Sequence, residues 1–268
     1  GYFGHRLADM AGRYKANVST IQKDWGKAFS LEEIESALKE HNPAVLAIVH
    51  AETSTGVCQP MDGIGDLCRK YNCLLLVDTV TSLGGVPLYL DEWKIDLAYS
   101  CSQKGLSCPP GLGPFSMNDR AENKMSKRKD KVPNWYLDVS LLNKYWGSDR
   151  VYHHTAPVNM NFGIREALRL LAEEGLEVSW DRHKKNAKLL WDSLENIGLE
   201  LQVKEELRLP TLTTVKIPEG VDGKAFTKHL LNNFGVEIGG GLGDLAGKVW
   251  RIGLMGYNST STNVDKII

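Results

Sequence analysis

Two charged side chains, those of Asp78 and Lys104, stand where strand-like segments end. Asp78 directly follows the apolar run 74–77, and Lys104 follows residues 97–99 and a short polar turn. A carboxylate after a buried apolar run is costly unless a cation or a hydrogen-bond donor is fixed beside it. A lysine at the carboxyl edge of a sheet lies where open α/β folds keep their ligand crevice, and its amine can serve there as a nucleophile. The pair predicts a reactive site, although a surface lysine and a capping aspartate explain each residue taken alone.

A lysine and an aspartate on neighbouring strand ends match what pyridoxal phosphate requires. Lys104 would hold the cofactor as a Schiff base, and Asp78 would keep the pyridine nitrogen protonated so that the ring remains an electron sink. Arg251 lies between Trp250 and Ile252 in a third strand-like run, where an unpaired guanidinium is expensive. Its planar fork suits the carboxylate of an amino acid, and a structural salt bridge is the alternative.

The runs around these residues resemble the alanine–glyoxylate and serine–pyruvate aminotransferases of class V. The resemblance rests on motifs that follow one another along nearly the whole chain, at residues 49–56, 76–85, 99–105, 151–157, 208–215 and 247–256. It implies a fold-type I pyridoxal-phosphate transferase of the α/β class. Such a fold has a mostly parallel sheet with helices on both faces and a small C-terminal α+β domain. Continuous apolar strands that alternate with helical segments agree with this architecture.

The resemblance also implies roles for further residues around the cofactor. Thr53 corresponds to a hydroxyl that contacts the phenolic oxygen, and Val80 to an apolar floor beneath the ring. Gln103, next to Lys104, corresponds to a donor to the cofactor phosphate. Because cysteine desulfurases carry histidine at that place, Gln103 favours the aminotransferase branch.

Two residues are implied to act across a subunit boundary. Tyr152 and Thr155 correspond to side chains that reach the phosphate of the cofactor bound in the other subunit, which requires a homodimer with composite sites. The implied reaction transfers the amino group of L-alanine or L-serine to glyoxylate, giving pyruvate or hydroxypyruvate and glycine.

Two other functions stay open at this point. One is another class V reaction, that of a cysteine desulfurase or a kynureninase-like hydrolase, because Cys101 and Cys108 lie near Lys104. The other is a truncated, non-catalytic subunit. The chain starts at Gly1 without methionine, and we expect it to lack an N-terminal segment that carries the phosphate-binding turn and a ring-stacking aromatic. Its last helix also looks shortened.

Composition narrows the range of partners. A net charge of -1 over 268 residues gives no electrostatic case for nucleic acid or a membrane surface, and no apolar run has the length of a membrane span. Five cysteines without a Cys-x-x-Cys pair indicate free thiols and oppose a zinc site. We expect an intracellular protein, cytoplasmic or peroxisomal. His153 and His154 suggest a metal, but adjacent side chains on an extended segment are expected on opposite faces, so no metal site is predicted.

The expected helices and strands follow from the periodicity of the apolar residues and from the residues that begin and end each segment. A helix is predicted at 4–14, a strand at 16–21, a helix that begins with the capping box Ser30–Glu33, and strands at 45–50, 74–77 and 97–99. Gly175 is the expected boundary between a large cofactor-binding domain, residues 1–174, and a small C-terminal domain, residues 175–268.

Overall fold

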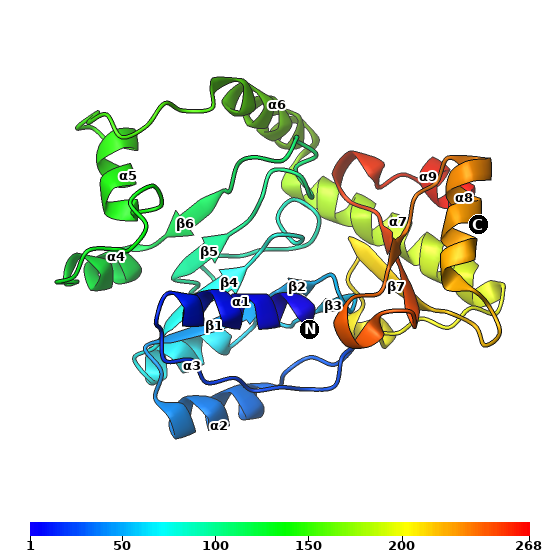
Figure 1. Cartoon of the computed structure of the whole chain (residues 1–268), viewed down its shortest axis with the longest axis horizontal. Helices are drawn as coiled ribbons and strands as arrows, with labels where there is room; N and C mark the ends of the chain where they lie inside the picture. The colour runs from blue at the N-terminus through cyan, green and yellow to red at the C-terminus, as the bar shows by residue number, and fades with distance from the viewer.

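A four-stranded sheet forms the centre of the N-terminal half in the computed structural model, which describes residues 1–268 (Figure 1). The strand order is β1-β4-β5-β6; the first three run parallel, and β6 lies antiparallel at the edge. The strands are β1 (Val45–Val49), β4 (Leu74–Asp78), β5 (Leu97–Tyr99) and β6 (Phe115–Met117). The register sets Val49 beside Asp78 and Asp78 beside Tyr99, so the carboxyl ends of the parallel strands meet at one edge.

The helices that surround this sheet have local causes. Ser30 and Glu33 form the predicted capping box, in which Ser30 Oγ accepts from the Glu33 N–H and Glu33 Oε2 accepts from the Ser30 N–H. The helix at 4–14 is also confirmed. The strand predicted at 16–21 is wrong: no strand pairs with it, and its apolar side chains Val18 and Ile21 are exposed. The helices are α1 (Tyr2–Arg13), α2 (Leu31–His41), α3 (Ile64–Lys70), α4 (Asp119–Ser126), α5 (Val139–Trp146) and α6 (Val158–Glu174).

The C-terminal part begins beyond Gly175, whose φ of +89° allows a sharp change of direction between α6 and α7. It contains an antiparallel sheet of order β7-β9-β8 packed against helices (Figure 1). Its elements are α7 (Leu176–Asn196), β7 (Leu212–Lys216), α8 (Gly223–Phe234), β8 (Gly239–Gly240), β9 (Val249–Gly253) and α9 (Ser261–Ile267). A short hairpin, β2 (Ala51–Glu52) with β3 (Val57–Cys58), follows β1, and single 3-10 turns lie at Glu205–Leu207, Gly243–Leu245 and Gly256–Asn258.

Two large hydrophobic cores support these sheets, and a smaller third cluster of Ala51, Val86, Leu209 and Leu212 joins the two halves of the chain. The first joins α2, α3 and the parallel strands through residues such as Ile34, Ile64 and Leu75. The second joins α7, β7 and β9 through residues such as Leu190 and Val215. The polar edge of the parallel sheet lies outside both cores, where side chains remain available for chemistry.

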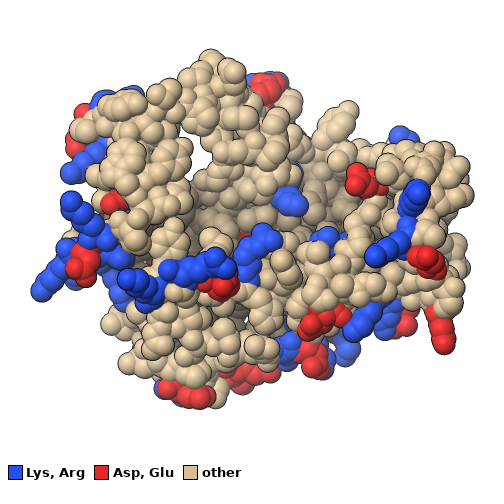
Figure 2. Space-filling model, in the orientation of Figure 1, with Lys and Arg blue, Asp and Glu red and all other residues tan.

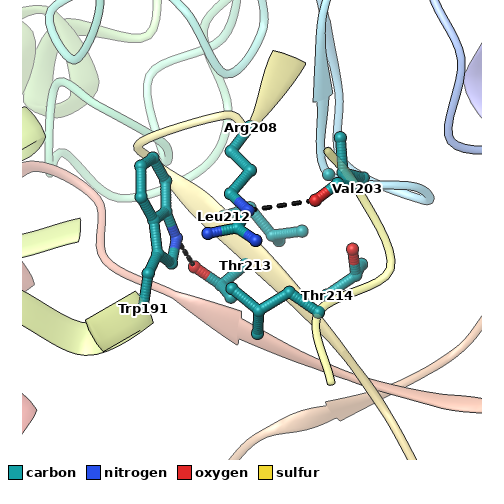
Figure 3. A pocket seen from close by; sticks show the side chains of 8 residues that line it. Trp191, Val203, Arg208, Leu212, Thr213 and Thr214 are labelled. Atoms are coloured by element: carbon teal, nitrogen blue, oxygen red, sulfur yellow. Dashed lines mark hydrogen bonds between the residues drawn. The ribbon is translucent and has the colours of Figure 1, made fainter. Parts of the chain in front are cut away.

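A small void in the C-terminal part carries no ligand site. It lies among Trp191, Arg208 and Thr213, and its volume of about 10 Å³ leaves room for at most one water molecule (Figure 3). Trp191 Nε1 donates to Thr213 Oγ1 at 2.8 Å, and Arg208 Nε donates to the Val203 carbonyl at 3.0 Å, so its polar groups are already paired.

The surface gives little indication of a macromolecular partner selected by charge. Lys and Arg side chains are mixed with Asp and Glu over the face drawn in Figure 2, and this face is hollowed near its centre. None of the helices is both long and apolar enough to cross a bilayer.

Candidate active site

Asp78 ends β4 with its carboxylate buried and bound to two neutral donors. The Tyr99 hydroxyl donates to Oδ2 at 2.5 Å, and the Val80 N–H donates to Oδ1 at 2.9 Å. Burial raises the pKa of Asp78, while the hydrogen bonds from Tyr99 and Val80 lower it. No basic side chain forms an ion pair with this carboxylate. Within the chain, Asp78 therefore has hydrogen-bond donors but no ion-pair partner.

Lys104 lies in the turn after β5, and its carbonyl accepts from the Ser107 N–H at 2.9 Å. The side chain is partly buried, and its amine makes no hydrogen bond and no ion pair within the chain. It opens onto a cleft of about 510 Å³. The cleft is lined by Gln103, Lys104, Ser107, Cys108, Pro109, Gly253, Met255, Tyr257 and Asn258. An amine with no partner beside such a cleft is free to react with a bound molecule.

The charges of Asp78 and Lys104 both affect the pKa of Cys101, which lies between β5 and Lys104. Burial raises the pKa of Cys101; the positive charge of Lys104 lowers it and the negative charge of Asp78 raises it. The register sets Asp78 beside Tyr99, and the turn with Lys104 begins just beyond that strand end.

Arg251 reaches this edge from β9 in the C-terminal part. Its Nε donates to the Gly240 carbonyl at 2.7 Å and its Nη1 to the Thr53 carbonyl at 3.4 Å. Burial lowers the pKa of Arg251, and the nearby Glu52 carboxylate opposes this effect. No carboxylate pairs with the guanidinium, so the salt bridge that was the alternative explanation is absent. A Cβ at Gly239 would lie 3.2 Å from Nη2, so glycine keeps space for the guanidinium there.

Other residues named from the sequence divide into two groups. Thr53 is buried next to the Arg251 contact, Val80 is partly buried beside Asp78, and Gln103 is exposed at the cleft. Tyr152 and Thr155 lie together, 3.4 Å apart through their hydroxyls, but they form no hydrogen bond to this edge. Tyr152 is 73% exposed, so neither residue is brought into the site within one chain.

The expectation for the adjacent histidines needs correction. His153 Nδ1 and His154 Nδ1 lie 2.8 Å apart instead of pointing to opposite faces, and His153 also stacks on Trp135 with ring centres 4.0 Å apart. Groups of His, Cys, Asp or Glu with the geometry of a metal site do not occur in the structure.

Helix α1 borders the site, which the sequence did not reveal. The buried Glu52 carboxylate accepts from the N–H groups of Phe3 and Gly4, at 3.4 and 3.1 Å, and so holds the start of the helix. The Arg6 guanidinium lies 4.8 Å from the centre of the Phe3 ring and lowers the pKa of Asp78. The apolar Tyr2-Phe3 pair at a helix start is the only sequence signal that could have suggested this position.

Comparison with known proteins identifies the family. The model of the aminotransferase class-V family matches residues 5–267. The chain belongs to the class V aminotransferases. It is 49% identical to an alanine–glyoxylate aminotransferase of Callithrix jacchus, covering 100% of this chain and 66% of that protein. A crystal structure of an alanine–glyoxylate aminotransferase from Nostoc sp. is 64% identical, with a TM-score of 0.99 over 100% of this chain and 71% of that chain.

A more distant relative extends the comparison. The (S)-ureidoglycine–glyoxylate transaminase of Bacillus subtilis is 38% identical, covering 98% of this chain and 68% of that protein. The chain therefore spans about two thirds of the length of the curated relatives it matches.

The cofactor of this family is pyridoxal phosphate, and the residues present fit it. A buried carboxylate without a cation suits a protonated ring nitrogen, and a partnerless amine suits a cofactor aldehyde. Both lie at the carboxyl edge of a parallel sheet, where α/β folds bind ligands. The expected fold class is confirmed with the family.

Proposed function

We propose that the protein is a pyridoxal-phosphate-dependent transaminase that moves the amino group of L-alanine or L-serine to glyoxylate. The products are pyruvate or hydroxypyruvate, and glycine. One observation carries the proposal: the amine of Lys104 and the guanidinium of Arg251 lack acidic partners at the same edge where Asp78 lacks a basic one. These charges are complementary to a ring nitrogen, a cofactor aldehyde and an amino-acid carboxylate.

Lys104 has two tasks in this proposal. Its amine would hold the cofactor as a Schiff base, and once released it would act as the base that takes the α-proton of the amino donor. The bound cofactor supplies an electron sink for the pair released from the Cα–H bond. Asp78 keeps the ring nitrogen protonated, and Tyr99 holds the carboxylate in place by its hydrogen bond.

The neighbouring side chains orient the ring and its substituents. We propose three contacts with the cofactor. The Thr53 hydroxyl would contact its phenolic oxygen, Val80 the lower face of its ring, and the Gln103 amide its phosphate. These roles are supported by the positions of Thr53 and Val80 beside Arg251 and Asp78, and by the exposure of Gln103 at the cleft. The Phe3 ring on α1 is a further candidate for contact with the cofactor, since Arg6 links it to Asp78.

Arg251 sets the substrate class. Its guanidinium is fixed by two backbone carbonyls and keeps N–H groups free for a carboxylate, which every α-amino acid and α-keto acid presents. Glyoxylate as the acceptor is supported by the relatives, whose names share glyoxylate although their amino donors differ.

We propose a homodimer in which Tyr152 and Thr155 serve the site of the partner subunit. Two features support it: both side chains are exposed, and aromatic side chains nearby are exposed as well, with Trp135 at 59% and Trp146 at 58%. A single chain would leave this aromatic surface in water. Analytical ultracentrifugation of wild type and Trp146→Glu tests it, since a shift of the variant toward monomer is expected.

A desulfurase function is opposed by the thiols near Lys104. A desulfurase needs a thiolate that can attack, whereas burial raises the pKa of Cys101 and Cys108 is buried. We also propose the division at Gly175 into a cofactor-binding unit and a C-terminal unit, because the two large hydrophobic cores lie on opposite sides of it; the small cluster of Ala51, Val86, Leu209 and Leu212 forms the contact between the units. The unpaired cysteines favour a reducing compartment, such as the cytoplasm or the peroxisome.

The test is an absorption spectrum of the protein with pyridoxal phosphate. A visible band of the bound cofactor should form, disappear with L-alanine and return with glyoxylate. Lys104→Ala should abolish the band and turnover, whereas the exposed Lys127→Ala serves as the control and should behave like wild type. A chain that forms no band, or a band that L-alanine and L-serine leave unchanged, would refute the proposal. Formation of alanine and elemental sulfur from cysteine would instead favour a desulfurase.

A further inference from the structure

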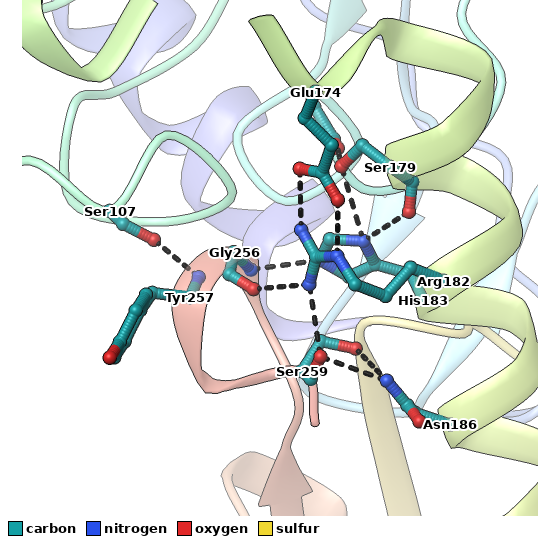
Figure 4. A network of polar contacts seen from close by, with 10 residues as sticks. Ser107, Glu174, Ser179, Arg182, His183, Asn186, Gly256, Tyr257 and Ser259 are labelled. Atoms are coloured by element: carbon teal, nitrogen blue, oxygen red, sulfur yellow. Dashed lines mark hydrogen bonds and ion pairs between the residues drawn. The ribbon is translucent and has the colours of Figure 1, made fainter. Parts of the chain in front are cut away.

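A buried group of polar contacts joins α7 to two loops near the proposed active site (Figure 4). Ser179 and His183 lie one turn apart on α7, and both are buried. The Ser179 hydroxyl donates to the Gly84 carbonyl at 2.7 Å, in the loop that follows Asp78. His183 Nε2 accepts from the Gly256 N–H at 2.8 Å, in the loop that follows β9. One face of α7 therefore contacts loops that continue from both sheets.

The contacts of His183 fix its protonation state. Because Nε2 accepts a backbone N–H, the proton is on Nδ1, which donates to the Ser179 carbonyl at 2.7 Å. Burial lowers the pKa of His183, and of the charged groups that face it, Arg182 lowers it and Glu174 raises it. Both ring nitrogens already have hydrogen-bond partners. A second proton, on Nε2, would place the ring N–H against the backbone N–H of Gly256.

Arg182, the residue before His183 on α7, binds the same loop. Its Nη1 donates to the Gly256 carbonyl at 2.8 Å and to the Ser259 carbonyl at 2.9 Å, while its Nη2 donates to Glu174 at 2.8 Å. The N–H and the C=O of Gly256 are thus both held by α7. This leaves the loop 256–259 little freedom to move relative to the helix.

The loop 256–259 also contacts the turn that carries Lys104. The Tyr257 N–H donates to Ser107 Oγ at 2.8 Å, and the Ser107 N–H donates to the Lys104 carbonyl at 2.9 Å. A Cβ at Gly256 would lie 1.9 Å from Ser107 Oγ and 2.8 Å from the Gly105 carbonyl oxygen. The two segments are therefore in direct backbone contact.

The Lys104 turn in turn lies against the loop that follows Asp78. A Cβ at Gly105 would lie 2.2 Å from the Leu83 carbonyl oxygen, so only glycine fits between them. The Lys104 turn is enclosed between the loop after Asp78 on one side and the loop 256–259 on the other. Both of these loops end on the same face of α7.

We propose that His183 is a positioning residue that fixes the amine of Lys104 relative to Asp78. It acts through the Gly256 N–H, the loop 256–259 and Ser107, and it touches neither substrate nor cofactor. The proposal rests on the proposed function for its kinetic consequence, but the contact chain itself can be measured without turnover. A displacement of a catalytic group by about 1 Å can cost about a hundredfold in rate, so a small shift of this loop is sufficient.

The test compares three variants with wild type. His183→Leu removes the acceptor for Gly256 and keeps an apolar volume; His183→Gln keeps an acceptor at similar reach. Leu190→Ala is the matched control, because Leu190 is equally buried on α7 but packs in the C-terminal core and makes no side-chain hydrogen bond to these loops. We expect His183→Leu to lower kcat by about tenfold to a hundredfold with little change in KM for the amino donor. Gln should restore most of kcat, and Leu190→Ala should lower stability without this loss.

Amide hydrogen exchange supplies a readout that does not depend on activity. In His183→Leu, exchange should accelerate in the loop 256–259 and also at Ser107 in the Lys104 turn, whereas in Leu190→Ala it should not. A folded His183→Leu protein with unchanged exchange at Ser107 and unchanged kcat overturns the proposal. So does a loss of kcat that Gln fails to restore and that Leu190→Ala shares.

A second variant covers failure of the first to fold. Ser107→Gly removes the acceptor of the Tyr257 N–H on the surface of the turn, and glycine tolerates the φ of +55° at that position. It should show the same fall in kcat and the same faster exchange at residues 256–259; wild-type values for both would refute the coupling. If wild type itself shows no transamination, the proposed function fails, while the exchange results still decide the positioning role.

Discussion

Tyr99→Phe isolates the contribution of one hydrogen bond to the proposed cofactor site. The Tyr99 hydroxyl lies 2.5 Å from Asp78 Oδ2, in the adjacent parallel strand. Phenylalanine keeps the ring and its packing but removes the donor. The carboxylate then retains only the Val80 N–H at 2.9 Å, in surroundings whose burial already raises its pKa.

The size of the effect follows from the charge of the acceptor. A hydrogen bond to a charged group contributes roughly 1.5–3 kcal/mol, and about 1.4 kcal/mol corresponds to a tenfold change in an equilibrium constant. The bond favours the ionised form of Asp78, which is the form that pairs with a protonated ring nitrogen. We therefore expect cofactor affinity to fall by roughly tenfold to a hundredfold. The pKa of Asp78 should rise further, so the acidic limb of the activity profile should move to higher pH.

The assay is a titration of the apoprotein with pyridoxal phosphate, followed by visible absorbance at several pH values. Tyr71→Phe is the matched control, because the half-buried Tyr71 hydroxyl also donates to a carboxylate, that of Glu35 at 2.8 Å, and neither residue lines the cleft beside Lys104. Equal affinities for wild type and Tyr99→Phe, with superimposable pH profiles, would refute the role given to this hydrogen bond.

Three further predictions concern other charged or titratable side chains, one in the site and two in the fold. Arg251→Lys should raise KM for the amino donor by roughly tenfold or more with a smaller effect on kcat, since lysine loses the fork; an unchanged KM in steady-state assays contradicts the assignment. Asp96→Asn should lower the free energy of unfolding by about 1.5–3 kcal/mol in urea titrations, because it removes the charge that Arg69 and Arg120 bind; a loss below 1 kcal/mol argues against it. Burial lowers the pKa of His50 to about 4. Below pH 6.5 this histidine is therefore protonated in the unfolded chain but not in the folded one. The free energy of unfolding should fall by about 3 kcal/mol between pH 6.5 and 4. Replacing His50 by Gln should flatten that dependence, and an equally steep slope in the variant would contradict the cause.

The main features of the site could be predicted from the sequence because they depend on local patterns. An apolar run followed by Asp78, and another followed by a turn with Lys104, determine strand ends, and parallel pairing brings strand ends to one edge. Arg251 was identified by the same reasoning, a charge inside an apolar strand. In each case the informative feature is a charged residue where burial is expected.

The missed residues depend on relations that no local pattern contains. Tyr99 reads as an ordinary strand aromatic, and only the register that sets it beside Asp78 reveals its hydrogen bond. Glu52 holds the start of α1 from a distant part of the chain. The strand predicted at 16–21 failed for a similar reason: alternating apolar residues form a strand only when a neighbouring strand is available to pair with them.

Asp96 shows what a structural buried charge looks like in this chain. Its carboxylate is fully covered and accepts from the Leu75 N–H and from Arg120, both at 2.8 Å, with Arg69 at 3.3 Å. Asp78 is buried to a similar degree but has only neutral donors, and Lys104 and Arg251 have no carboxylate at all. The same fold therefore neutralises one buried charge completely and leaves others at the sheet edge without partners. Since an uncompensated charge in a protein is expensive, the difference indicates that the missing partners come from molecules that bind there.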